Sequence, residues 1–152
     1  MTLKTKKISR EVEVQRRWKE HEEKRKAHQK EVKILHFKRR MARSVEESEA
    51  LEALINKKVT EWNRWNPFRS RDYHDLHGMT KKGAEEYVKW HVDLARKRGG
   101  KTVLRFETGR GNNSPNKIPA IKVALMAIYG KKPFCRTELE PGNDGVLRMV
   151  IL

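Results

Sequence analysis

The spacing of apolar residues changes twice along the chain. In residues 1–43 they are sparse and separated by long polar runs, so this segment cannot build a core of its own. In residues 45–63 they recur at helical spacing, and from about residue 73 short apolar runs of strand length alternate with helical stripes. The pattern predicts a helical or disordered arm over 1–43, a helix and connector over 44–72, and one globular domain over 73–152.

Turn and cap residues place the boundaries of the second segment. Ser44, followed three residues later by Glu47, has the form of a capping box and predicts a helix over 45–63. Pro67 lies in the polar stretch 63–71 and marks it as a connector. We interpret Trp65 and Phe68 in this connector as packing anchors, with base-stacking platforms as the alternative.

The third segment predicts a two-layer α/β sandwich in the order βαβαββ. Thr80 is placed to cap its first helix, and Gly99 to end it. The expected strands are 73–77, 102–108, 134–139 and 146–152, and the second helix spans 118–129. The helix residues expected to face inward are Ala84, Tyr87, Val88, His91, Leu94 and Ala95, then Ile121, Ala124, Leu125 and Ile128.

Two helices can cover only one face of a four-stranded sheet, so each strand should have an apolar side and a tolerant side. Leu76, Leu104 and Phe106 are expected to face the helices. The residues expected on the open face are Asp75, His77, Arg105, Glu107 and Arg148.

Charge points to a polyanionic partner. The chain has 36 Lys and Arg against 20 Asp and Glu, a formal net charge of +16, and such a surplus favours nucleic acid binding. Residues 1–43 hold sixteen of these cations and six Glu, which fits a phosphate-binding arm or a solvated helix.

No apolar run is long enough to span a membrane. Cys135 is interpreted as a small core residue. A single cysteine leaves no internal disulfide, and this, together with the absence of a signal-peptide pattern, predicts a cytoplasmic or nuclear protein.

Two motifs carry candidate chemistry. Asp75 and His77 place a carboxylate and an imidazole at a strand end, as an acid/base pair or as a surface ion pair. Residues 108–114 form a glycine-rich turn before a helix, where backbone amides and Arg110 suit a phosphate. If the strands before these motifs are parallel, both motifs emerge at one edge of the sheet.

Four other histidines receive no functional role. His21, His28 and His36 lie in the polar arm and are expected to be solvated, whereas His91 is expected in the core. None of these four is assigned to a metal, and no cofactor is expected.

Four motifs in order over some eighty residues resemble the Smr domain, the small MutS-related nuclease module. They are Asp75-Leu76-His77-Gly78-Met79-Thr80, Thr108-Gly109-Arg110-Gly111-Asn112, Ile118-Pro119-Ala120-Ile121-Lys122 and Gly145-Val146-Leu147. The resemblance implies a fold like that of the C-terminal domain of translation initiation factor three. It also implies endonuclease activity, as DNA nicking in some members and in others as cleavage of RNA, including messages on stalled ribosomes.

Carried over by position, the resemblance implies Asp75, His77 and Arg110 as catalytic residues. The glycine-loop motif of the family falls on Thr108, Gly109, Arg110 and Gly111. The residues that we expect to bind phosphate are Thr108, Gly109, Gly111, Asn112, Asn113, Ser114, Arg105 and Lys122. The chain departs from the pattern at Asn113, where many members have His.

The function we expect first is an RNA endonuclease, with association with the ribosome left open, in which the basic arm holds the RNA and Asp75 and His77 perform acid/base chemistry. The alternatives are a Mg²⁺-dependent DNA nickase that uses Asp75 and Glu107, and a catalytically silent RNA- or ribosome-binding protein.

Overall fold

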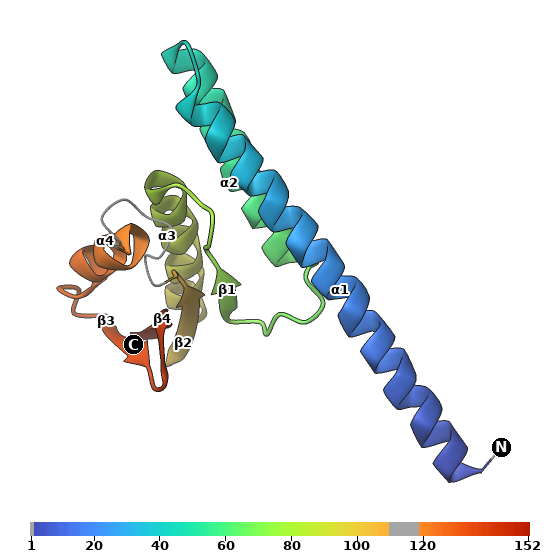
Figure 1. The fold of residues 1–152 in the computed structure, drawn as a ribbon. Helices are drawn as coiled ribbons and strands as arrows, with labels where there is room; N and C mark the ends of the chain where they lie inside the picture. The colour runs from blue at the N-terminus through green and yellow to red at the C-terminus, as the bar shows by residue number, and fades with distance from the viewer. Residues whose placement is uncertain (1, 110–118) are drawn as a thin grey trace.

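The computed structural model describes residues 2–109 and 119–152, which form four helices and a four-stranded mixed sheet (Figure 1). The βαβαββ order predicted for the third segment is confirmed. The elements are α1 Leu3–Arg40, α2 Val45–Trp65, β1 Tyr73–Asp75, α3 Lys81–Arg98, β2 Thr102–Glu107, α4 Ala120–Tyr129, β3 Cys135–Glu140 and β4 Asn143–Ile151. The likeness to initiation factor three stays an expectation of the resemblance.

The sheet has the strand order β1-β2-β4-β3, in which β1 and β2 are parallel and the other neighbours antiparallel. The register pairs Asp75 with Glu107, and pairs Arg105 with both Tyr73 and Arg148. Residues opposite each other in register share a face. Arg105, Glu107, Asp75 and Arg148 therefore share one face of the sheet, as predicted, whereas His77, predicted on the same face, lies in the loop after β1.

The other face of the sheet carries the core. Leu104 and Phe106 are at most 1% exposed and cluster with Val88 of α3 and Leu125 of α4. Two inward predictions are wrong: the expected core residues Leu94 and Ile128 are 40% and 37% exposed. In their place Val92, one turn after Val88, and Tyr129, one turn after Leu125, are buried. The buried face of each helix is narrower than the apolar face predicted from the sequence. Each helix contacts the core with one row of side chains about one turn apart.

Helices α1 and α2 form an antiparallel hairpin. Ser44 caps α2 as expected, since its hydroxyl accepts from the Glu47 N–H at 3.1 Å. Val32 and Leu35 of α1 are buried in the same cluster as Ile55 of α2. Figure 1 shows that α2 runs beside the C-terminal part of α1, while the N-terminal end of α1 extends past the rest of the molecule.

Two asparagines of α2 attach this hairpin to the sheet domain, residues 73–152. The Asn63 side chain accepts from the Asp75 N–H at 2.8 Å and donates to the Asp75 carbonyl at 2.7 Å. Asn56 donates to the Thr80 hydroxyl and accepts from the Thr80 N–H. Asn63 thus pairs with the free edge of β1 as a neighbouring strand would, and α2 occupies the place of a fifth strand.

The expectation that the three arm histidines are solvated is wrong. His21 is 6% exposed, and its Nε2 lies 2.8 Å from the Asn66 Oδ1. The His28 ring stacks on Trp62 at 4.8 Å. His36 donates to the Gly78 carbonyl at 2.6 Å. Because 21, 28 and 36 are seven and eight residues apart, all three lie on one face of α1, the face that docks on the rest of the chain.

Within the described residues, none of the helices combines the length and the apolar character that crossing a bilayer requires. Cys135 is buried and unpaired, as expected of a small core residue.

Candidate functional site

A cleft of about 520 Å³ lies between α1 and the ends of β1 and β2. Asp75, His77 and Thr108 line it from the sheet domain, so the structure brings together three of the predicted site residues. The opposite wall belongs to α1, which contributes Arg25, His28, Gln29, Val32, Lys33, His36 and Arg40. The ends of the parallel strands β1 and β2 meet at one edge of the sheet, as predicted, and of the second motif Thr108 and Gly109 are described there.

The loop after β1 presents His77 to solvent. The strand ends at Asp75, two residues earlier than predicted, because the Asp75 Oδ1 accepts from the backbone N–H of His77 at 2.8 Å and turns the chain. Leu76 between them is fully buried and anchors the loop in the core. Asp75 therefore holds the backbone of His77, and the imidazole stays exposed beside the cleft.

Asp75 is a partly buried carboxyl with a second carboxyl beside it. Burial, and then the charge of Glu107, raise the pKa of Asp75 to about 7. The His77 N–H and the Arg25 charge act in the opposite direction. Glu107 accepts from the Tyr73 hydroxyl at 2.9 Å. Asp75 can therefore hold or release a proton near neutral pH, as a general acid or base requires.

Contacts with the site loop fix α1 in place. Gly78 has φ +91°, and a Cβ built on it would lie 2.9 Å from the Val32 Cγ1, so only glycine fits under the helix here. One turn further on, His36 donates to the Gly78 carbonyl. A segment expected as an arm is thus one wall of the candidate site.

The cleft is electropositive. Arg25, Lys33 and Arg40 line it from α1, and Lys81 lines it from the start of α3. Burial lowers the pKa of His28, and the charges of Lys58 and His77 lower it further, against the effect of Glu31. An anionic ligand is the complement of such a wall.

The second motif is only partly described. Thr108 is 7% exposed, and its N–H donates to the Gly145 carbonyl at 2.9 Å, which ties the end of β2 to β4. A Cβ built on Gly109 would lie 3.5 Å from the His77 Cδ2, so the loop leaves β2 directly beside the imidazole. The predicted site residues Arg110, Gly111, Asn112, Asn113 and Ser114 lie outside the described residues.

Two further candidates pair with other parts of the chain. Arg105 is on the open face of the sheet, where its guanidinium is paired with Glu140 and lies 4.9 Å from the Tyr73 ring centroid. Lys122 of α4 donates to the Asp144 carbonyl at 3.0 Å. Neither residue lines the cleft that holds Asp75 and His77.

Sequence reasoning missed the residues that α1 supplies, above all Arg25, His28 and His36. The signal was the spacing of the arm histidines, which repeats every two turns and marks a docked face. Histidine counts as polar in an apolar pattern, so this spacing did not predict a buried face.

Among the described residues, no three His, Cys, Asp or Glu side chains are grouped closely enough to hold a metal ion. Asp75 and Glu107 form a pair of carboxylates on neighbouring strands.

Comparison with known proteins gives a likeness to one solved domain. No family model matches the chain, and no curated protein matches it. The chain is similar to a solved structure described as "Solution structure of the B3BP Smr domain", with 23% sequence identity and a TM-score of 0.47. The match covers 68% of this chain and 98% of that one.

Proposed function

We propose that this protein is an endonuclease of the Smr type that cleaves RNA in the cleft between α1 and the sheet domain. One observation carries the proposal: Asp75 and His77 lie in one cleft with a wall of cationic side chains from α1. The cations supply sequence-independent affinity for a phosphate backbone, and the imidazole and the carboxyl supply proton transfer.

The proposed chemistry uses the 2′-hydroxyl of the substrate. The 2′-oxygen attacks the phosphorus and gives its proton to the base, while the bond from phosphorus to the 5′-oxygen breaks and that oxygen takes a proton from the acid. His77 and Asp75 fill these two roles, since an imidazole can accept or donate a proton through its ring nitrogens and burial raises the pKa of Asp75 to about 7. The products are a 2′,3′-cyclic phosphate and a 5′-hydroxyl.

A labelled single-stranded RNA, incubated with and without a chelator, tests the proposal. We expect cleavage in both conditions, and a loss of about 10²-fold or more in His77→Ala and Asp75→Asn with RNA binding nearly unchanged. His91→Gln is the matched control, because His91 is partly buried on α3 and does not line the cleft. An RNA with one 2′-deoxy sugar at the cut site should resist cleavage, and its cleavage at the normal rate would overturn this chemistry.

A Mg²⁺-dependent DNA nickase is the second candidate, favoured by the pairing of Asp75 with Glu107. Two adjacent carboxylates suit a hard divalent cation. This candidate predicts nicking of supercoiled DNA that a chelator abolishes and that Glu107→Gln lowers. RNA binding without cleavage of either substrate would indicate a silent binding protein of the same fold.

A further inference from the structure

A second cleft, of about 380 Å³, lies further toward the N-terminus of α1. Arg17, Glu20, His21 and Lys24 line it from α1, and Trp65 and Phe68 line it from the end of α2 and the connector. We call this group the aromatic cleft. It lies outside the site described above and shares no lining residue with it.

The aromatic rings of this cleft are both packed and accessible. Phe68 lies edge-on to the His21 ring at 4.7 Å, and Trp65 is parallel to the His21 ring at 6.1 Å. Nevertheless Trp65 is 46% exposed and Phe68 is 44% exposed. Trp18, which meets Phe68 edge-on at 5.2 Å, is 50% exposed. Large apolar surfaces gathered in one exposed patch usually mark a binding site.

Cations surround these rings. The Lys24 Nζ lies 4.8 Å from the centroid of the Trp65 ring, and Arg17 lines the same cleft. The carboxylate of Glu20 also lines it but accepts from Arg16 at 2.8 Å, so its charge is compensated. Rings flanked by cations bind single-stranded nucleic acid, because a base stacks on the ring while the neighbouring phosphate meets the cation.

The aromatic cleft adjoins the candidate active site. Trp62 lines the larger cleft, and its ring lies 5.2 Å from that of Trp65. His21 and His28, one in each cleft, are seven residues apart on α1, which is about 10 Å along the helix axis. A strand lying along this face of α1 can occupy both clefts.

We infer that the aromatic cleft binds an unpaired nucleobase of the substrate strand, stacked on Trp65 and Phe68, with the adjacent phosphate bound by Lys24 and Arg17. The inference rests on the proposed nucleic acid partner but not on cleavage. It gives the protein a preference for unpaired strands at a position separate from the cut.

The test compares two single strands of 2′-O-methyl RNA, which lack the attacking hydroxyl and stay intact. One strand carries all its bases, and the other carries abasic sugars, so the two have the same phosphate charge. We expect the natural protein to bind the strand with bases at least about fivefold more tightly, the lower bound for stacking of one base. Phe68→Leu should reduce this ratio toward one and leave the salt dependence of binding unchanged, while Phe68→Tyr should keep the ratio.

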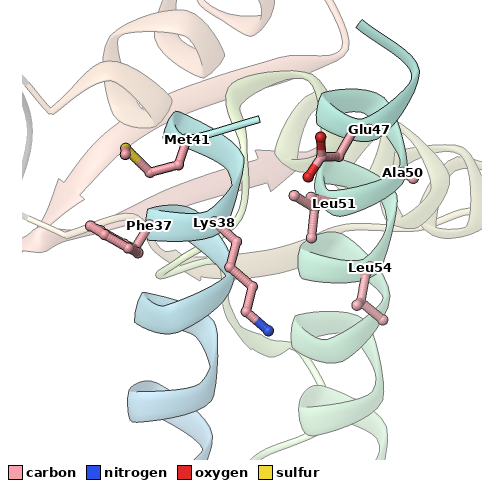
Figure 2. Close-up of a pocket in the computed structure, with 7 residues that line it drawn as sticks. All are labelled: Phe37, Lys38, Met41, Glu47, Ala50, Leu51 and Leu54. Atoms are coloured by element: carbon pink, nitrogen blue, oxygen red, sulfur yellow. The ribbon is translucent and has the colours of Figure 1, made fainter. Parts of the chain in front are cut away.

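The matched control is Phe37→Leu. Phe37 is 57% exposed on α1, and near the hairpin tip it lines a separate hollow together with Leu51 and Leu54 (Figure 2). We expect this variant to keep the full ratio. Equal binding of the two strands by the natural protein, or an undiminished ratio in Phe68→Leu, would overturn the inference and leave the proposed function standing. Failure to bind either strand would overturn both.

Discussion

At the scale of the residue, Asp75 combines the structural and the proposed chemical role. Its carboxylate turns the chain by accepting from the His77 N–H, and its backbone pairs with Asn63. Burial of the carboxyl beside Glu107 raises its pKa. A group held in this way has a cost in stability, because the folded state disfavours its ionised form.

Asp75→Asn is therefore expected to stabilise the protein at high pH. The pKa of Asp75 is higher in the folded chain than in the unfolded chain, so stability from this group is complete at about pH 4 and is lost as the pH rises through about 7. Asparagine keeps the acceptor for the His77 N–H and cannot ionise. The variant should match the natural protein at pH 4 and exceed it at pH 8 by roughly 1–4 kcal/mol in urea unfolding. A difference that does not change with pH would contradict the burial of this carboxyl.

Glu107→Gln tests the interaction between the Asp75 and Glu107 carboxyls in a second way. Removing the neighbouring negative charge should lower the pKa of Asp75, because that charge is the second cause of its shift. Carboxyl titration by NMR measures the change directly. An unchanged pKa of Asp75 would show that the charge of Glu107 does not contribute to the shift.

At the scale of the element, α2 completes the sheet. Its Asn63 occupies both the backbone N–H and the carbonyl of Asp75 on the free edge of β1, and it also donates to the Val59 carbonyl. The Asn63 side chain is buried, so its loss leaves two backbone groups without partners.

We expect Asn63→Ala to lower the free energy of unfolding by about 2–4 kcal/mol. Chemical denaturation measures the effect, with Glu61→Ala on the exposed side of the same helix as the control at under about 0.5 kcal/mol. Similar small effects of both variants would mean that water replaces Asn63 at the strand edge.

The contact of α1 with the site loop gives another prediction at this scale. Gly78→Ala should cost about 1–3 kcal/mol, because the added Cβ meets Val32 at 2.9 Å and because φ is +91°. Gly142→Ala is the control: Gly142 has φ +76° but open space around its Cβ, so only the cost of the backbone conformation remains. When Gly78→Ala is combined with Val32→Ala, the clash is relieved, so the two changes in the free energy of unfolding should not add. Additive changes, which mean an interaction energy of zero, would place α1 away from this loop.

At the scale of the whole molecule, the two ends of α1 have different structural roles. Its C-terminal part belongs to the core through Val32 and Leu35, so removal of residues 1–43 as a whole would expose the cluster that they complete. Its first turns are exposed and project beyond the rest of the chain (Figure 1). The projecting end can therefore be altered without loss of the fold, and it is the part free to contact phosphates at a distance from the cleft.

Replacing Lys4, Lys6, Lys7 and Arg10 with Gln should weaken RNA binding and flatten its dependence on salt. Each phosphate that the protein no longer neutralises reduces the slope of log affinity against log salt by about 0.7 for a single strand, so the slope should fall by up to about 3 with no change in the melting temperature. The control neutralises four exposed lysines on and after α3, namely Lys82, Lys89, Lys97 and Lys101. Equal changes in the two variants would show that only net charge matters, and that the projecting helix has no particular role in binding.

Much of this protein followed from local sequence alone. Apolar residues with periods of 2 and 3.6 predicted the order of elements in the sheet domain and the two faces of β2. Cap and turn residues predicted the helix starts at Ser44 and Thr80. Both signals act over only a few positions in the sequence. The motifs around Asp75 and Thr108 could be placed at one sheet edge because a crossover between parallel strands has a fixed hand.

Only the tertiary structure decided what α1 does. Its apolar residues are too few to predict a buried face, and the contacts that bury it come from Trp62 and Gly78, distant in sequence. The pairing of Arg105 with Glu140 likewise depends on a strand 35 residues away, and Arg105 does not line the cleft that holds Asp75 and His77. Periodicity indicates which side of an element is apolar, but it does not indicate which element packs on that side. The packing of α1 against the sheet domain determines the wall of the candidate site.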